Sequence, residues 1–245
     1  MGFSQAGFQV YGTDLFEKYN RKRYPFPSAK GDAIEILDRL LAGEKIQFSH
    51  WDAEAKTYVD DELLGIEDFS VLAGSPPCQA FSIATSSIRS TEEGKKKYKD
   101  FVGLTRERFL ASGLPYTIEN VPGAPLIPEK TIVLCGTQFD MTAVDLDGTL
   151  LHLRRHRQFE SNVPLIVAKP CEHKKGNIYA GSYGGSQRTR EGAKKRAGGY
   201  VPPKSVQEEL MGINWMPETA LYQAIPVKYA EHIGKQLITH LKKKI

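Results

Sequence analysis

The stretch FSVLAGSPPCQAFS, residues 69–82, is an apolar run that ends in a turn and is followed by a cysteine. Its first six residues are typical of a buried strand, and Gly74 allows a sharp bend where that strand ends. The next two prolines stiffen the backbone immediately before Cys78. We therefore expect a strand that delivers the Cys78 thiol to the edge of a sheet.

Upstream of this stretch, a second strand and a helix are predicted. Residues 8–14 have the pattern of a strand, and apolar residues recur at helical spacing over 33–41 before a stop at Gly43. Two later apolar runs, 116–120 and 131–136, predict further strands. The order strand, helix, strand is typical of an α/β fold with a parallel sheet covered by helices.

The composition is that of a globular protein with one main domain. The chain has 245 residues, of which 40% are hydrophobic and 25% charged. No apolar stretch approaches the ~18 residues of a membrane-spanning helix, and the first residues lack the order of a signal peptide. We expect no membrane partner and a cytoplasmic location.

The three cysteines predict neither disulfides nor a metal site. Cys78, Cys135 and Cys171 are an odd number, far apart in the sequence, which is typical of a reducing compartment. Cys135, Cys171 and His173 are possible zinc ligands, but no pair has the CxxC or HxxxH spacing of common zinc sites. We therefore predict that the protein binds no metal.

Positive charge is concentrated in one segment. Residues 165–204 contain nine Lys or Arg and two Glu, a net +7, so the rest of the chain carries 4 − 7 = −3. Glycines and tyrosines are interleaved with these charges. The natural partner of such a segment is a polyanion, most simply nucleic acid. The alternative is a solvated flexible loop, which is what most basic runs are.

Four chemically useful side chains follow apolar runs, namely Asp14, Asp32, Cys78 and Glu119. Ligands of an open parallel sheet bind beyond the carboxyl ends of its strands. We therefore expect these four groups to lie along one edge of the sheet. A lone carboxylate in such a position can also be a turn former or a helix cap, and Asp32 by itself fits that alternative.

Several motifs resemble those of the DNA cytosine-5 methyltransferases, in that family's order and over nearly the whole chain. The segment GSPPCQAFS is similar to the catalytic motif, IENVPG to the glutamate motif and LRRHRQFESN to the arginine motif. YGTD and GDA resemble the cofactor-side acids, and EELMGIN with QAIPVKYAEHIG resembles the closing segments. The resemblance implies a Rossmann-like methyltransferase sheet that binds S-adenosylmethionine, with a small inserted target-recognition region.

The implied reaction is transfer of a methyl group to C5 of cytosine in DNA. Addition of the Cys78 thiolate at C6 makes the ring an enamine, which can attack a methyl sulfonium. The resemblance gives Glu119 the stabilisation of charge at N3. It has Arg155 helping to hold the base and Arg157 supporting the pocket.

The resemblance also implies the cofactor and DNA contacts. Asp14 would bind the ribose hydroxyls and Asp32 the adenine, with Pro76 also on the cofactor side. The target base has to be flipped out of the duplex to reach the thiol, and residues 79–100 would close behind it. The expected DNA contacts are Gln79, Ser82, Arg188, Arg190, Lys194, Lys195 and Arg196.

The expected organisation is a catalytic domain over 1–162, a short basic target-recognition region over 163–204, and helices over 205–245 that complete the catalytic domain. The family's opening strand, central in its sheet, and the Gly-rich loop after it have no counterpart here, so weak cofactor binding is expected. We expect a monomer that acts on double-stranded DNA in a bacterial or phage-infected cell. The alternatives are a non-catalytic DNA-binding remnant and an RNA cytosine-5 methyltransferase on the same fold.

Overall fold

The computed structural model describes residues 1–15, 23–82, 91, 99–183 and 199–243. Its strands are β1 (Gly12–Asp14), β2 (Ser28–Lys30), β3 (Ile46–Asp52), β4 (Thr57–Leu64), β5 (Leu72–Gly74), β6 (Tyr116–Asn120), β7 (Thr131–Leu134), β8 (Thr142–Val144), β9 (Leu150–Leu153), β10 (Arg157–Ser161) and β11 (Ile178–Ala180). Its α-helices are α1 (Gly2–Ala6), α2 (Ala33–Leu41), α5 (Val102–Ala111), α7 (Lys204–Met211), α8 (Glu218–Leu221) and α9 (Val227–Lys242). Short 3₁₀ turns are η2 (Ile66–Asp68), η3 (Cys78–Ala80), η5 (Pro128–Lys130) and η6 (Gly136–Phe139).

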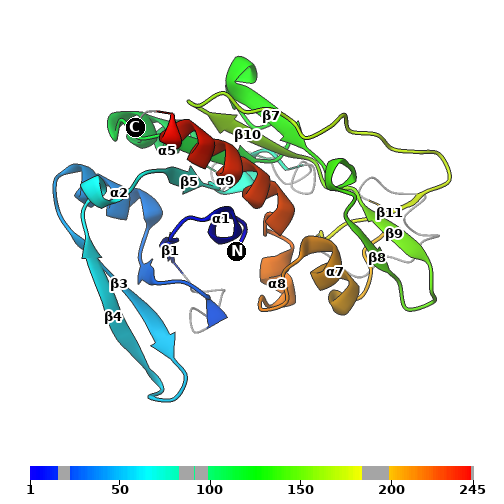
Figure 1. The fold of residues 1–245 in the computed structure, drawn as a ribbon, viewed down its shortest axis with the longest axis horizontal. Coiled ribbons are helices and arrows are strands. Elements are labelled where there is room, and N and C mark those ends of the chain that lie inside the picture. The colour runs from blue at the N-terminus through cyan, green and yellow to red at the C-terminus, as the bar shows by residue number, and fades with distance from the viewer. Residues whose placement is uncertain (16–22, 83–90, 92–98, 184–198, 244–245) are drawn as a thin grey trace.

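The described strands form three sheets, with the orders β1-β2-β3-β4, β5-β6-β10-β7 and β11-β9-β8 (Figure 1). Each sheet contains both parallel and antiparallel pairs. The predicted α/β class is confirmed. The single parallel sheet that the strand, helix, strand order suggested is wrong for the described residues, because antiparallel strands follow β2 and separate β6 from β7. Within these residues, no helix combines the length and the apolar character needed to cross a membrane.

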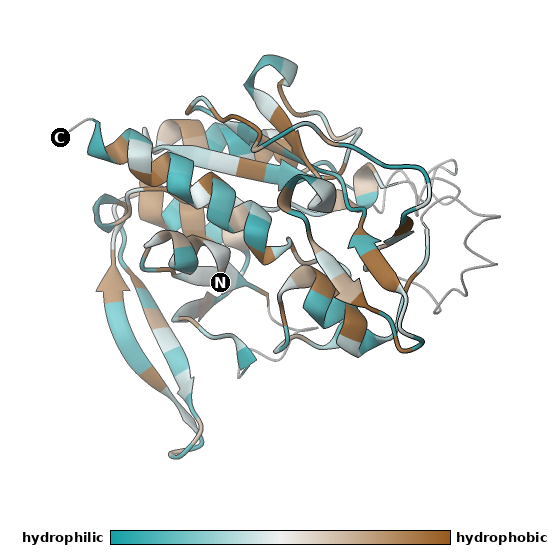
Figure 2. Cartoon of the chain, turned by 45° about the vertical axis from the view of Figure 1, so that its right-hand side comes forward, coloured by the Kyte–Doolittle hydropathy of each residue, from teal (hydrophilic) through white to brown (hydrophobic). Residues whose placement is uncertain are grey.

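The first sheet contains a long hairpin that the sequence did not predict. β3 and β4 pair antiparallel with an irregularity between Gln47 and Ser49, and Figure 1 shows the hairpin projecting from the rest of the molecule. Residues of β4 are exposed at all positions but the last, and most of the hairpin is hydrophilic or neutral (Figure 2). Its second strand carries no alternating apolar pattern, because it has no core to face.

The second sheet positions the candidate site. β5 and β6 pair parallel, and β10 lies antiparallel between β6 and β7. All five residues of β6 are buried, and its bounds are those predicted from the sequence. Helix α5 covers the face that carries Tyr116 and Ile118, while α9 covers the face that carries Leu134 and Phe159. This sheet is therefore an apolar layer between two helices.

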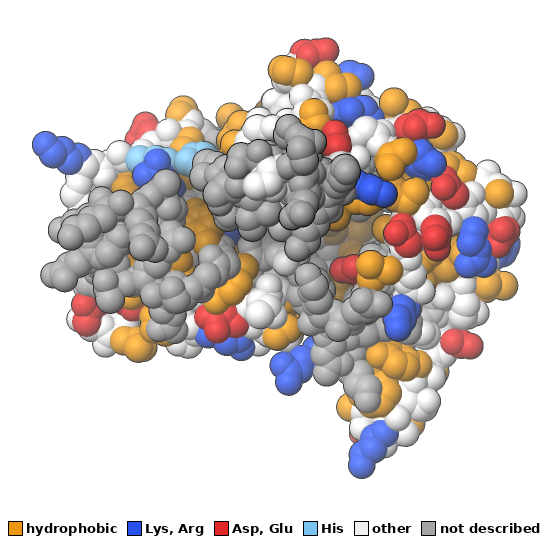
Figure 3. Space-filling view, turned by 180° about the vertical axis from the view of Figure 1, so that it is seen from behind, with side chains coloured by type: hydrophobic (Ala, Val, Ile, Leu, Met, Phe, Trp, Pro, Cys, Tyr) orange, Lys and Arg blue, Asp and Glu red, His pale blue; other side chains and the backbone are white. Residues whose placement is uncertain are grey.

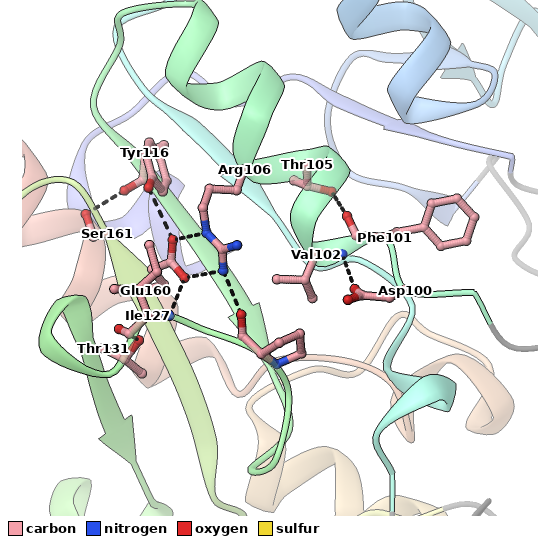
Figure 4. Close-up of polar contacts among 11 residues, drawn as sticks. Asp100, Phe101, Val102, Thr105, Arg106, Tyr116, Ile127, Thr131, Glu160 and Ser161 are labelled. Carbon is pink, nitrogen blue, oxygen red and sulfur yellow. Dashed lines mark hydrogen bonds and ion pairs between the residues drawn. The ribbon is translucent and has the colours of Figure 1, made fainter. Parts of the chain in front are cut away.

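The α5 face of this sheet is held by a buried carboxylate, Glu160 (Figure 4). It accepts hydrogen bonds from Arg106 Nε and Nη2, both at 2.7 Å, from the Ile127 amide at 2.8 Å and from the Tyr116 hydroxyl at 3.2 Å. Burial opposes ionisation, but these donors lower the pKa of Glu160. A fully bonded buried carboxylate fixes the register of its neighbours, so Glu160 ties α5 to the β6–β10 pair.

The arginine motif does not lie on one strand. The chain leaves the third sheet at Leu153, the end of β9, and enters the second sheet at Arg157, the start of β10. Residues 154–156 form the connection between the two sheets. Residues 151–159, with Leu153, Arg155, Arg157 and Phe159 at a period of two, predict one strand with these side chains on one face. That prediction is wrong, although burial still alternates from Leu151 to Arg155.

Candidate functional site

Cys78 lies in η3, directly beyond the end of β5, and is half-buried. β5 and β6 are parallel neighbours, with Gly74 opposite Ile118, so the chain leaves both strands at the same edge. The side-chain amide of Asn120 donates to the Pro76 carbonyl oxygen at 3.0 Å. This bond fastens the end of β6 to the loop that carries the thiol.

Gly74 is needed for a close approach. A Cβ at this position would lie 2.9 Å from Cζ of Phe109 and 3.2 Å from Cγ2 of Thr105, both on α5. Gly74 is not among the glycines with positive φ. The sharp bend inferred from the sequence is thus replaced by tight packing of α5 against the end of β5.

Glu119 and Arg157 form a buried ion pair on the α9 face of the sheet. Residues directly opposite in an antiparallel pair share a face, and side chains two residues apart on a strand do too. Glu119 is opposite Phe159, and Arg157 lies two residues before Phe159. The Arg157 Nε and Glu119 Oε1 atoms are 3.0 Å apart, with side-chain exposures of 11% and 9%.

The environment favours the neutral forms of Glu119 and Cys78. Burial raises the pKa of Glu119, while the charges of Arg157 and Arg155 and a hydrogen bond with Ser75 act in the opposite direction. Burial also raises the pKa of Cys78, Arg157 lowers it and Glu119 raises it. The charges of Arg157 and Glu119 therefore both influence the pKa of the Cys78 thiol. The group can hold a proton at a carboxyl and release one from a thiol, which suits acid–base and nucleophilic chemistry.

Arg155 has a different environment from Arg157. It is fully buried, and its guanidinium donates to the carbonyl oxygens of Ser182, Tyr222 (2.8 Å) and Ala224 (3.0 Å). Burial lowers the pKa of Arg155 to about 9. The Arg155 carbonyl oxygen in turn accepts from the Tyr229 hydroxyl at 2.7 Å. Arg155 therefore joins the connection between β9 and β10 to two later segments of the chain.

The cofactor-side acids lie on the first sheet, apart from the sheet of Cys78 and Glu119. Asp14 is exposed at the end of β1, and its Oδ1 accepts from the Leu15 amide at 2.7 Å. Asp32 is the N-cap of α2, and its Oδ1 accepts from the amides of Ile34 (2.8 Å) and Glu35 (3.4 Å). The alternative of a helix cap is thus confirmed for Asp32. The expected alignment of all four groups along one sheet edge is wrong for the described strands, because they belong to two sheets.

Of the predicted DNA contacts, only Gln79 and Ser82 lie within the described residues. Gln79 belongs to η3, and the Ser82 amide donates to the Cys78 carbonyl oxygen at 2.9 Å. Both residues therefore lie in the turn that carries the thiol. Most of the predicted closing loop 79–100 lies outside the described residues, as do five of the basic side chains, Arg188, Arg190, Lys194, Lys195 and Arg196.

A cavity of about 460 Å³ lies away from these residues. Its lining comes from residues 7–11, before β1, and from residues 68–71, before β5, together with Glu62 and Leu64 of β4. It is therefore at the amino ends of these two strands, whereas Cys78 and Glu119 are at the carboxyl ends.

No protein-family model matches this chain, and no curated protein is significantly similar to it. The site stands on its geometry alone. His156, between Arg155 and Arg157, has no spacing in the sequence that would mark it as a ligand. Its side chain belongs to a separate cluster with Cys135, Cys171 and His173.

Proposed function

We propose that this protein transfers a methyl group from S-adenosylmethionine to C5 of cytosine in double-stranded DNA. The observation that carries the proposal is the convergence of Cys78, Glu119 and Arg157 from three segments that are far apart in the sequence. A thiol, a carboxyl group of raised pKa and a cation are the groups that thiolate addition to a pyrimidine requires.

Each group has a role in a balanced reaction. The Cys78 thiol loses its proton, and a bond forms from its sulfur to C6 of the flipped cytosine, while Glu119 gives a proton or a hydrogen bond to N3. S-adenosylmethionine, when bound, supplies the methyl group to C5. Loss of the C5 proton to water then restores the C5–C6 double bond and expels the Cys78 thiolate. N3 returns its proton to Glu119, and the thiolate recovers from water the proton that the thiol released there. Arg157 orients the Glu119 carboxyl and stabilises the thiolate.

We propose that the roles of the two arginines are exchanged relative to those implied by the resemblance. Arg157 is beside Glu119, so it is suited to contact the base. Arg155 has its two terminal nitrogens bonded to backbone carbonyls, so it is suited to brace the pocket.

This exchange predicts different effects for two matched substitutions. Arg155→Met removes the donor to one buried and two partly buried carbonyl oxygens, and we expect it to lower the free energy of unfolding by about 3 kcal/mol. Arg157→Met is expected to lower methyl transfer about 10²-fold, with a smaller effect on stability, because the Glu119 carboxyl that it leaves behind can take up a proton. Urea unfolding and a methyl-transfer assay on both variants measure the two effects. Equal losses of stability would contradict the exchange.

The residues fit the adenosine end of the cofactor. The exposed Asp14 carboxylate at the end of β1 can accept hydrogen bonds from two ribose hydroxyls. Both cap bonds of Asp32 use Oδ1, so its second carboxylate oxygen is not part of the cap. Asp14 and Asp32 would therefore hold the adenosine, and the Pro76 loop would border the sulfonium side.

The order of the strands supports a Rossmann-like sheet in two parts. β1 is an edge strand of the first sheet and β5 an edge strand of the second among the described residues. The cavity lies between the segments that precede these two strands. A central strand placed between β1 and β5 would join the two sheets into one, which is the position of the family's opening strand.

Bisulfite sequencing of DNA from cells that express the protein tests the proposed function. We expect 5-methylcytosine at a fixed position within a recurring sequence, and none with Cys78→Ser. The second candidate is a DNA-binding protein without catalysis, favoured by the separation of the cofactor-side acids from the Cys78 sheet. Specific DNA binding without any methylation would support that candidate and overturn the first.

The basic segment provides a prediction about affinity. Neutralising Lys194, Lys195 and Arg196 together is expected to reduce the dependence of DNA binding on salt, because each lost phosphate contact lowers the slope of log K against log salt by about 0.9. Fluorescence anisotropy over a range of salt concentrations measures the slope. A matched control neutralises Lys235, Lys242 and Lys243 near the C-terminus, and this variant should keep the wild-type slope. Equal slopes for all three proteins would mean that the segment is only a solvated loop.

A further inference from the structure

Four metal-binding side chains converge on one point beside the arginine motif. They are Cys135, His156, Cys171 and His173, and their ligand atoms all lie within 4.8 Å of one another. Cys135 is fully buried, whereas Cys171 and His173 are exposed. Figure 3 shows histidine side chains gathered at one place on the back of the molecule. The cluster thus has a buried base and an accessible outer side.

The separations match a tetrahedral zinc site. Bonds of about 2.3 Å to sulfur and about 2.0 Å to nitrogen place a sulfur and a nitrogen ligand about 3.5 Å apart. The Sγ atom of Cys135 is 3.5 Å from Nε2 of His173. The Sγ atom of Cys171 is 3.5 Å from Nε2 of His156 and 3.4 Å from Nε2 of His173. Three edges of the group therefore already have the lengths that zinc would impose.

Hydrogen bonds alone do not account for this convergence. The Nε2 atom of His173 carries either one proton or one lone pair, so it can bond only one of the two sulfurs that face it. A cation at the centre satisfies all four groups at once.

The ligands join an irregular segment to the ends of the paired strands β7 and β10. Cys135 follows β7, His156 lies in the connection between β9 and β10, and the other two ligands lie in an irregular segment. Residues 166–176 are all exposed, so this segment has almost no apolar core of its own. Gln138 fastens it, accepting from the Cys135 amide at 2.7 Å and donating to the Lys169 carbonyl oxygen at 2.8 Å. Lys169 also pairs with Asp140, and the Ile166 amide donates to Gln236. A structural metal would add a further attachment.

We propose that Cys135, His156, Cys171 and His173 bind one structural Zn²⁺ ion. Two thiolates and two neutral imidazoles form a tetrahedral set that prefers zinc to magnesium or calcium, whose ligands are oxygens. The two thiolate charges balance the charge of the ion. The proposal does not depend on methyl transfer, because none of the four side chains belongs to the group around Cys78.

The test measures metal in the full chain. Protein purified without chelators, loaded with Zn²⁺ and freed of excess metal by gel filtration is expected to contain about one zinc per chain. Co²⁺ in place of zinc should give the intense visible bands of a tetrahedral site with thiolate ligands. Protein with no retained zinc, or cobalt spectra of an octahedral site, would overturn the proposal.

Variants identify the ligands. Cys171 and His173 are exposed, so Cys171→Ser and His173→Gln leave the core intact, and circular dichroism checks that each variant is folded. Each is expected to bind zinc at least about 100-fold more weakly. Cys78→Ser and His240→Gln are the matched controls and should retain the metal. Unchanged zinc affinity in both ligand variants, or a Cys135–Cys171 disulfide in the purified protein, would contradict the site.

Discussion

Replacement of Cys78 by serine is expected to lower methyl transfer about 10⁴-fold or more, because the hydroxyl cannot replace the thiolate as a nucleophile toward C6. The measurement is transfer of labelled methyl groups to DNA. A second measurement uses an oligonucleotide with 5-fluorocytosine at the target, which blocks loss of the C5 substituent and traps the adduct. With cofactor present, the wild-type protein should form a stable covalent complex, and Cys78→Ser should form none.

The other two cysteines are internal controls for the trapping experiment. Peptide mapping of the adduct is expected to identify Cys78, and an adduct at Cys135 or Cys171 would show that the nucleophile is wrongly assigned. Burial raises the pKa of Cys78 above the ordinary value of a thiol. At neutral pH the thiolate fraction is therefore small, and it grows about tenfold per pH unit until the pH passes the pKa. Adduct formation should accordingly accelerate between about pH 7 and about pH 9.

Glu119→Gln is expected to lower methyl transfer by about 10²-fold to about 10⁴-fold, the range of a lost general acid. Glutamine keeps the shape and can still donate a hydrogen bond, but it cannot transfer a proton to N3. Its effect should appear in the rate of a single turnover, with little change in DNA affinity. Glu129→Gln, an exposed change in η5, is the matched control and should leave both quantities as they are.

The dependence of activity on pH can show whether Glu119 donates a proton or has only a structural role. Burial raises the pKa of Glu119, so its protonated form persists to a higher pH than in an exposed glutamate. Activity that depends on this proton falls as the pH rises through the pKa, and the Glu119→Gln variant lacks that fall. A variant with wild-type activity, or with the same pH profile at a lower rate, would remove Glu119 from the proposed proton transfer.

Strands that are buried along their whole length could be predicted from the sequence, because their residues form an apolar run. The strand β6 was found with its observed bounds, since its run YTIEN is buried throughout. The hairpin was missed, because β4 is exposed and rich in acidic residues. Strand pairing also lay beyond the sequence pattern, since nothing in the run 157–161 indicates that β10 lies antiparallel between β6 and β7.

The candidate site could be predicted only in part. The turn after β5 and the end of β6 were expected to lie at one edge, and the parallel pairing places them there. The different surroundings of Arg155 and Arg157 were not predictable, because alternation along a strand cannot reveal that the chain changes sheets between them. Three members of the Cys and His cluster, Cys135, Cys171 and His173, were possible zinc ligands in the sequence, but their spacing predicted no metal site. Spacing rules recognise only neighbours in sequence, whereas these ligands and His156 come from three segments.

The attachment of residues 166–176 to Gln138 has a consequence for protein engineering. On the proposed function, a new DNA specificity would be obtained by exchanging the expected recognition region for that of another protein. A junction at residue 163, where the recognition region was expected to begin, would remove the Lys169 backbone that Gln138 holds and the Lys169 side chain that pairs with Asp140 at 2.7 Å. A junction after Asn177, just before β11, preserves both contacts. The segment that could be exchanged therefore begins after Asn177 and is shorter than the charge pattern suggests. Residues 163–177 should be kept with the rest of the protein.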